Sequence, residues 1–303
     1  MFFFPQFVSA VVINSPSGAG NTSAPPDDPG WANVGMLAGA TGTYIGWGWV
    51  LTAAHVGAGT ITLNGLSYEE EPGTAVQLSN NTPGQSLLTD LVLYRLKSTP
   101  EGIAPLTLAS TPSATNSSVT LIGSGRDRGN FTEWSVNTST NPWTWTEVTA
   151  GANAAGYQTL DARSMRWGTN SISASGLWVS NGALDIHSFS TTFDFSAGPN
   201  EAQPVVGDSG GAVFSKNGSA WMLSGLIVAV GGYSGQPTVA TTPVYGNVAY
   251  IADISTYAPQ ILAVIPEPST GSILLVAAAW GLIALSLKRI APRKVLSVGF
   301  SNR

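Results

Sequence analysis

The sequence contains no cysteine and only two histidines, His55 and His187, among its 303 residues. Disulfide bonds and thiolate-based zinc sites are therefore excluded, and a metal site built from histidines is not expected. Lysine and arginine are absent before Arg95, and residues 1–265 carry 7 basic against 16 acidic side chains. This acidic balance argues against nucleic-acid binding. Glycine loops of the Walker or dinucleotide-binding type are also missing, so no cofactor is expected.

Residues that favour turns are abundant, with 35 glycines and 19 prolines. Between them lie short apolar segments, and no helical periodicity of useful length appears in this part of the chain. Short strands joined by many turns are typical of an all-β barrel or sandwich. The segments are residues 46–51, 60–63, 90–96, 118–122, 212–214 and 221–230.

Two motifs carry chemistry. The letters TAAH follow an apolar run and end at His55, and the letters GDSGG place Ser209 in a glycine-rich turn. A serine hydroxyl is a poor nucleophile unless a base takes its proton during attack. A histidine, which titrates near neutral pH, can take that proton and later return it to the leaving amine. Bare backbone around the serine lets the N–H groups of Gly207 and Ser209 face a developing oxyanion.

Both motifs, in this order, resemble the chymotrypsin/trypsin family of serine proteases, over about residues 31–254. The resemblance implies an all-β fold of two six-stranded antiparallel barrels. It also implies a catalytic triad in which His55 is the general base and Ser209 the nucleophile. We expect a monomeric serine endopeptidase that acts on polypeptides through an acyl-enzyme.

The same resemblance places the orienting acid on a strand between the histidine and the serine. Asp90 precedes an apolar strand and fits this position better than any other carboxylate. His187 lacks the small-residue strand end and is expected to be a polar loop or strand residue. The weaker candidates for the acid lie in a charge run or outside strand context, and they are Glu69, Glu70, Glu71, Asp127 and Asp161.

The residue beside the nucleophile, Asp208, is expected to pair with a buried cation and so to hold the oxyanion loop in its active shape. In many family members that cation is a new N-terminus made by cleavage after a basic residue, but no basic residue precedes His55 here. Two alternatives for the partner of Asp208 remain open: an N-terminus made by removal of the signal peptide, or another donor. The family resemblance implies that Gln203 forms the floor of the specificity pocket and that residues 228–232 form its far wall.

The N-terminal residues 1–13 are apolar and resemble the second half of a secretory signal peptide, but they lack its basic region. Either the true start lies upstream or the signal is unusual. A first barrel strand is the less favoured alternative, and residues 14–30 are interpreted as a linker. The peptidase domain is predicted over residues 31–258.

The C-terminal residues 271–287 form an uncharged apolar stretch, at the short limit for a transmembrane helix. A basic cluster follows within residues 288–294, and Pro266-Glu267-Pro268 precedes. This arrangement resembles the PEP-CTERM sorting signal of Gram-negative bacteria, here residues 264–294. The resemblance implies an exosortase-type sorting protease as a partner, export across the inner membrane, a transient membrane anchor and a cytoplasmic tail over residues 295–303. An ordinary C-terminal anchor is the alternative.

Two other functions compete with the endopeptidase. The sorting tail also suits a catalytically silent adhesion or matrix module on the same fold. A lipase-like hydrolase is disfavoured, because a histidine should then follow Ser209 and none does. Residues 131–180 contain five tryptophans, which are interpreted equally as an exposed binding surface or as packing of the second barrel.

Overall fold

The computed structural model describes residues 11–180 and 182–265. The chain divides into a compact unit up to Ala263 and a second unit from Val264 onward. The predicted transmembrane helix, the Pro-Glu-Pro motif and the cytoplasmic tail lie outside the described residues. Within the described ranges, no helix is long and apolar enough to cross a bilayer.

The first subdomain is a seven-stranded antiparallel sheet with the order β6-β5-β2-β3-β4-β8-β7. Its core includes the buried side chains of Leu37, Tyr44, Val50 and Tyr94. Six strands closed into a barrel were expected, so the strand count is wrong for this subdomain. Short, partly exposed strands at its two edges, β6 and β7, gave little apolar signal. The strands are β2 (Val34–Leu37), β3 (Ala40–Gly46), β4 (Trp49–Ala53), β5 (Ile61–Leu63), β6 (Leu66–Tyr68), β7 (Val76–Ser79) and β8 (Leu88–Arg95).

The second subdomain is a closed six-stranded barrel with the order β13-β14-β18-β17-β16-β9, as the family resemblance implied. Side chains that alternate inward along its strands, such as Leu121, Val213 and Ile251, fill the barrel. Each of the predicted apolar segments overlaps a strand of one subdomain or the other. The barrel strands are β9 (Ser118–Gly123), β13 (Arg166–Ser180), β14 (Asp185–Thr192), β16 (Ala212–Asn217), β17 (Ala220–Gly231) and β18 (Val248–Asp253).

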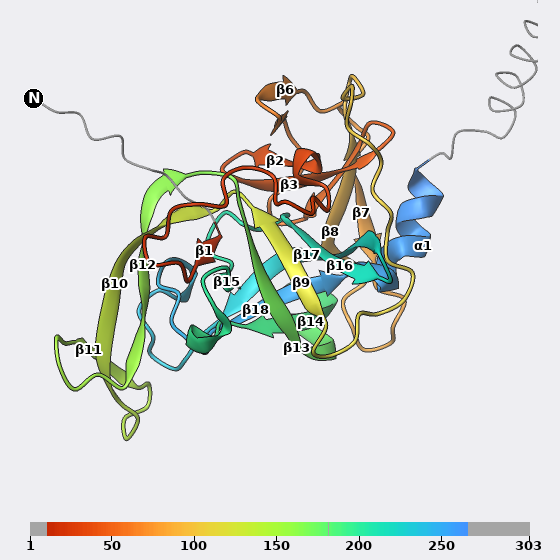
Figure 1. The fold of residues 1–303 in the computed structure, drawn as a ribbon. Coiled ribbons are helices and arrows are strands. Elements are labelled where there is room, and N and C mark those ends of the chain that lie inside the picture. The colour runs from red at the N-terminus through yellow and green to blue at the C-terminus, as the bar shows by residue number, and fades with distance from the viewer. Residues whose placement is uncertain (1–10, 181, 266–303) are drawn as a thin grey trace, which may run out of the picture. The chain divides into compact units, whose positions relative to one another are not determined.

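A separate three-stranded sheet, which the sequence did not predict, extends from the barrel (Figure 1). It comprises β10 (Arg126–Asn137), β11 (Thr144–Glu147) and β12 (Ala154–Arg163), with β10 in the middle. Trp134 is 1% exposed and meets Trp145 edge to face, with ring centroids 6.0 Å apart. Of the five tryptophans in residues 131–180, three belong to this sheet or to its β10–β11 loop, and Trp167 and Trp178 lie on β13.

Near the N-terminus, β1 (Val12–Ile13) pairs antiparallel with β15 (Ala202–Gln203). Val11, Val12 and Ile13 are almost completely buried. This finding corrects the assignment of these residues to a signal-like segment, because they are an integral part of the folded body. The part of the chain that the structure describes also contains three short 3-10 helices: Trp31–Asn33, Phe195–Ala197 and Val239–Thr241.

After β18 the chain forms its only described α-helix, α1 (Ile254–Val264). The buried hydroxyl of Tyr257 in α1 donates to Asn80 Oδ1 (2.9 Å) and accepts from the backbone N–H of His187 (2.9 Å). It also accepts from the hydroxyl of Thr89 (3.3 Å), which directly precedes Asp90. One side chain of the helix thereby joins the two subdomains next to the predicted acid.

Candidate active site

His55 and Asp90 are brought together by the pairing of β4 with β8. Ala53, the last residue of β4, lies opposite Leu91, so the residues that follow and precede them are adjacent. The His55 ring Nδ1 lies 2.7 Å from Asp90 Oδ2, and the His55 backbone N–H donates to Asp90 Oδ1 at 2.9 Å. Both carboxylate oxygens are thus engaged, which fixes the position of the ring as well as its orientation.

The environment of this pair stabilises the charged form of the imidazole more than water does. The hydrogen bond that the ring donates to Asp90 raises the pKa of His55 above its ordinary value, against the opposing effect of partial burial. Asp90 is buried, whereas the His55 side chain is 41% exposed. Because Nδ1 donates to the carboxylate, Nε2 is the nitrogen that can accept a proton from a partner on the open side.

The loop that carries Ser209 is attached to β3, the strand next to β4 in the first sheet. The backbone N–H of Thr41 donates to the Ser209 carbonyl (3.0 Å), and the Thr41 hydroxyl donates to the Gly207 carbonyl (2.8 Å). Thr43 donates its hydroxyl to the Gly210 carbonyl at 2.9 Å. A Cβ atom at Gly210 would overlap the Thr41 carbonyl, so this close approach requires glycine.

The Ser209 side chain is partly exposed, and its hydroxyl makes no hydrogen bond to His55 within the described part of the chain. The β4–β8 pair therefore holds His55, and the adjacent strand β3 anchors the loop that carries Ser209. Catalytic hydrogen bonds in uncomplexed enzymes are often long and tighten only when substrate binds.

Two backbone donors in this loop have no acceptor among the described residues. They are the N–H groups of Gly207 and Ser209, whereas the neighbouring N–H of Asp208 donates to the Val205 carbonyl (3.0 Å). Gly207 has φ = 95°, a conformation that favours glycine. The free N–H groups are the two that the sequence predicted as an oxyanion hole.

Asp208 is completely buried, and backbone N–H groups surround it. Its carboxylate accepts from Gly125 (2.7 Å), from Val205 (2.8 Å) and from Val11. Burial raises the pKa of Asp208 to about 7, although these donors and the nearby positive charge of Arg163 act in the opposite direction. The backbone N–H dipoles therefore stabilise the carboxylate, but its negative charge is only weakly neutralised by the positive charge of Arg163.

The backbone of Val11 is strained where its N–H contacts Asp208. Its φ is 28°, which is an outlier for a β-branched residue and costs about 1–3 kcal/mol. The side chain is nevertheless 0% exposed. Sequence reasoning missed Val11, Gly125 and Arg163, because they are distant in sequence from Asp208 and carry no motif.

The structure places the residues predicted to form a specificity pocket at two different locations. Gln203 lies on β15, is 1% exposed, and its Oε1 has no hydrogen-bond partner in the described ranges. Two residues of the predicted far wall, Val228 and Ala229, do line a cavity of about 450 Å³ beside the His55–Asp90 pair. The other lining residues are Val179, Ser180, Leu184 and Ile186.

The residues given little weight as catalytic groups have structural partners. His187 Nδ1 lies 2.8 Å from the hydroxyl of Thr256, and its ring packs against Trp178. Glu69 and Glu71 form exposed ion pairs with Lys97 and Arg95, and Asp161 pairs with Arg126. Glu70 forms an isolated bridge with Leu96, and Asp127 is buried on β10, where its charge acts on Arg166.

A mostly β protein with two sheet subdomains, a histidine–carboxylate pair and a serine in a glycine-rich turn has the architecture of the trypsin-like serine peptidases. The model of the trypsin family matches residues 19–254. The chain therefore belongs to the trypsin family, and this membership suggests a serine-type peptidase.

Among solved structures, the chain is similar to neuropsin, a serine protease expressed in the limbic system of mouse brain. The two share 16% sequence identity with a TM-score of 0.47, and the match covers 80% of this chain and 97% of that one. A search of curated proteins found no match.

Proposed function

We propose that this protein is a serine endopeptidase. In the proposed reaction Ser209 Oγ attacks the carbonyl carbon of a peptide bond while its proton passes to His55 Nε2. The N–H groups of Gly207 and Ser209 stabilise the oxyanion, and His55 then gives the proton to the leaving amine. Water, activated by the same imidazole, hydrolyses the resulting acyl ester. The observation that carries this proposal is the doubly hydrogen-bonded His55–Asp90 pair, with the Ser209 loop attached to the neighbouring strand.

Labelling with a fluorophosphonate probe tests the nucleophile directly. We expect the folded, mature wild type to be labelled, and Ser209→Ala not to be. Peptide hydrolysis should disappear in the same variant. Hydrolysis that persists in Ser209→Ala, or a folded wild type that fails to label, would instead favour the alternative of a silent adhesion module, which the predicted sorting tail suggests.

The cavity beside His55 supports a preference for apolar substrate side chains. Apart from His55 and Asp90, its lining is apolar except for Ser180, and it carries no other charged residue. A buried charge on the substrate would find no partner there. We therefore propose that an apolar residue next to the scissile bond occupies this cavity. A peptide series that varies single positions should show the highest kcat/KM with Leu, Ile or Val at one of them.

We propose that maturation removes the residues before Val11. Val8, Ser9 and Ala10 have the small-residue pattern that signal peptidases favour just before a cut. Cleavage after Ala10 would convert the strained Val11 amide into an α-ammonium group that already lies against Asp208. A charged ammonium donor would then replace a neutral amide donor at a buried carboxylate, and an ion pair would form. N-terminal mass spectrometry of the exported protein should identify Val11 as the first residue, and a different start would overturn this route.

At the other end, we propose that residues 264–294 act as a PEP-CTERM signal for an exosortase-type protease. On this proposal the protein crosses the inner membrane of a Gram-negative bacterium, is anchored transiently, and reaches the envelope or the medium. Mass spectrometry of the mature C-terminus tests it. The expected terminus lies near Pro266, and an intact terminus at Arg303 would favour an ordinary anchor.

A further inference from the structure

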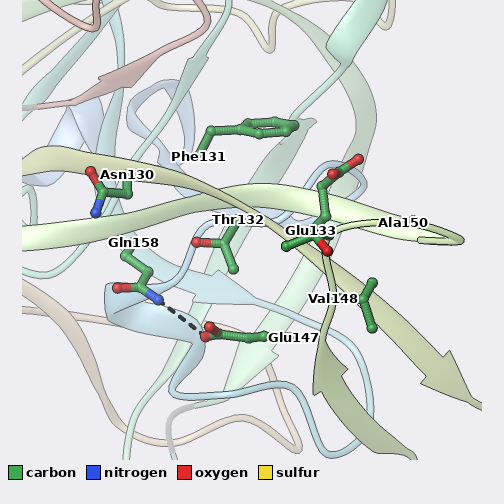
Figure 2. Close-up of a pocket in the computed structure, with 9 residues that line it drawn as sticks. Asn130, Phe131, Thr132, Glu133, Glu147, Val148, Ala150 and Gln158 are labelled. Carbon is green, nitrogen blue, oxygen red and sulfur yellow. Dashed lines mark hydrogen bonds between the residues drawn. The ribbon is translucent and has the colours of Figure 1, made fainter.

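The sheet β10–β12 changes character along its length. Its middle part is open to solvent, where the exposed side chains of Glu147 and Gln158 share a hydrogen bond of 3.1 Å and border a hollow of about 780 Å³ (Figure 2). Its foot instead packs against the loop that carries Ser209, the oxyanion loop. Gly125, immediately before β10, donates its backbone N–H to Asp208 at 2.7 Å. The foot is therefore the part of this sheet that can influence the proposed reaction.

Four arginines lie at the foot of the sheet or at the start of the adjoining strand β13: Arg126, Arg128, Arg163 and Arg166. Three of them have other partners. Arg126 pairs with Asp161, and Arg128 donates to backbone carbonyls near the N-terminus. Arg166 is completely buried, and the charge of Asp127 acts on it. The fourth, Arg163, forms no ion pair and no hydrogen bond within residues 11–180 and 182–265.

The guanidinium of Arg163 lies directly on the backbone of Gly207. A Cβ atom built on Gly207 would overlap Arg163 Nη1 and would lie 2.7 Å from its Cζ and 3.1 Å from the Cα of Gly125. Nη1 is buried and has no hydrogen-bond partner in the described part of the chain. A buried donor of this kind is costly unless negative charge nearby compensates it.

The compensating charge is the carboxylate of Asp208, on the other side of the same glycine backbone. A Cβ atom built on Gly125 would lie 2.6 Å from Asp208 Cγ. Three backbone N–H groups face this carboxylate, and the charged group that acts on it is Arg163, which lowers the pKa of Asp208 against the effect of burial. The absence of side chains at Gly125 and Gly207 thus lets the cation approach the carboxylate without a direct ion pair.

We propose that Arg163 is a positioning residue, whose charge partly compensates that of buried Asp208 and so keeps the oxyanion loop in place before the N-terminus is processed. This inference rests on the proposed peptidase function. On the proposed maturation route, the ammonium group of Val11 later becomes the direct partner of Asp208. The unprocessed chain is then partly active rather than silent.

The test measures kcat and KM of the unprocessed full chain for one peptide over a range of pH. Arg163→Gln should lower kcat by about 5- to 10-fold between about pH 7 and pH 6, with little change in KM, because Asp208 is then neutral in more of the molecules. These values follow if the substitution raises the pKa of Asp208 by about one unit from about 7. The loss should disappear near about pH 9, where Asp208 is ionised in both proteins. The titration of His55 is common to both and cancels in their ratio.

Three controls separate this role from a general structural one. Arg163→Lys keeps the charge and should restore most of the activity, and the matched variant Arg126→Gln should behave as the wild type because its partner is the exposed Asp161. In a chain that starts at Val11, made by cutting a fused leader just before it, Arg163→Gln should lose less than about twofold, because the ammonium group compensates the carboxylate. An equal loss at every pH, or in both forms of the chain, would overturn the proposal.

Titration of Asp208 in the unprocessed Ser209→Ala variant separates this inference from catalysis. NMR spectra of protein labelled with ¹³C at the aspartate carboxyl groups, assigned with Asp208→Asn, should show a midpoint about one pH unit higher after Arg163→Gln. If the wild type hydrolyses no peptide but the midpoint moves, the peptidase proposal fails and the interaction of Arg163 with Asp208 stands. An unchanged midpoint refutes the inference whatever the activity.

Discussion

Replacing Asp90 with asparagine should abolish most of the activity while preserving the fold. Asp90 Oδ1 accepts the backbone N–H of His55, so the asparagine oxygen must keep that position and its NH₂ group must face the ring. An NH₂ group donates, and Nδ1 must then accept, which moves the ring proton to Nε2. The imidazole can then no longer take the proton of Ser209. Holding the histidine in the wrong tautomer lowers kcat by about 10⁴-fold, which is equivalent to about 5 kcal/mol of activation barrier.

The assay is a pH profile of kcat/KM for one peptide substrate, with Asp161→Asn as a control that removes a carboxylate from the surface. Because the hydrogen bond that His55 donates to Asp90 raises the pKa of His55, its loss should also move the acid limb of any residual activity to lower pH. Thermal unfolding checks that the variant is folded. A well-folded Asp90→Asn protein that loses less than tenfold in kcat/KM would refute the reasoning.

Three further predictions concern the surroundings of the site. Gly207→Ala should lower kcat by about 10²-fold or more, because a Cβ there meets the Arg163 guanidinium and displaces an oxyanion donor; unchanged turnover would contradict the assignment. Burial raises the pKa of Asp208 in the folded chain to about 7, so the free energy of unfolding of unprocessed protein should fall by up to about 4 kcal/mol between pH 4 and pH 7. Denaturant titrations should show a smaller fall in Asp208→Asn, and an identical fall would exclude Asp208 as its source. Tyr257→Phe should destabilise the protein by about 1–3 kcal/mol, measured by the same titrations, because three hydrogen bonds meet at that hydroxyl.

The sequence was most informative where local chemistry requires particular residues. The histidine at the end of β4, the aspartate on β8 and the glycine-rich turn at Ser209 were all recognisable. The pairing of the first two is now visible as a direct hydrogen bond. The six-stranded barrel of the second subdomain was implied by the family resemblance. The apolar segments 118–122, 212–214 and 221–230 by themselves indicated only short buried strands.

The three-stranded sheet was not predictable in the same way. Its strands mix charged, polar and aromatic residues, and much of both faces is accessible, so no clean alternation marks them. The partners of Asp208 were hidden for a different reason. Val11 and Gly125 contribute only backbone N–H groups, and a backbone donor leaves no trace in the identity of the residue that supplies it.

The position of α1 has a consequence for the proposed processing at the C-terminal end of the chain. Tyr257 and Gln260 fasten the helix to Asn80 and Ser79 of the first subdomain, and Ile265, just beyond the helix, is still buried. On the proposed processing near Pro266, the cut would fall beyond these contacts of α1. The hydrogen bonds that join the helix to the first subdomain would therefore remain in the trimmed chain.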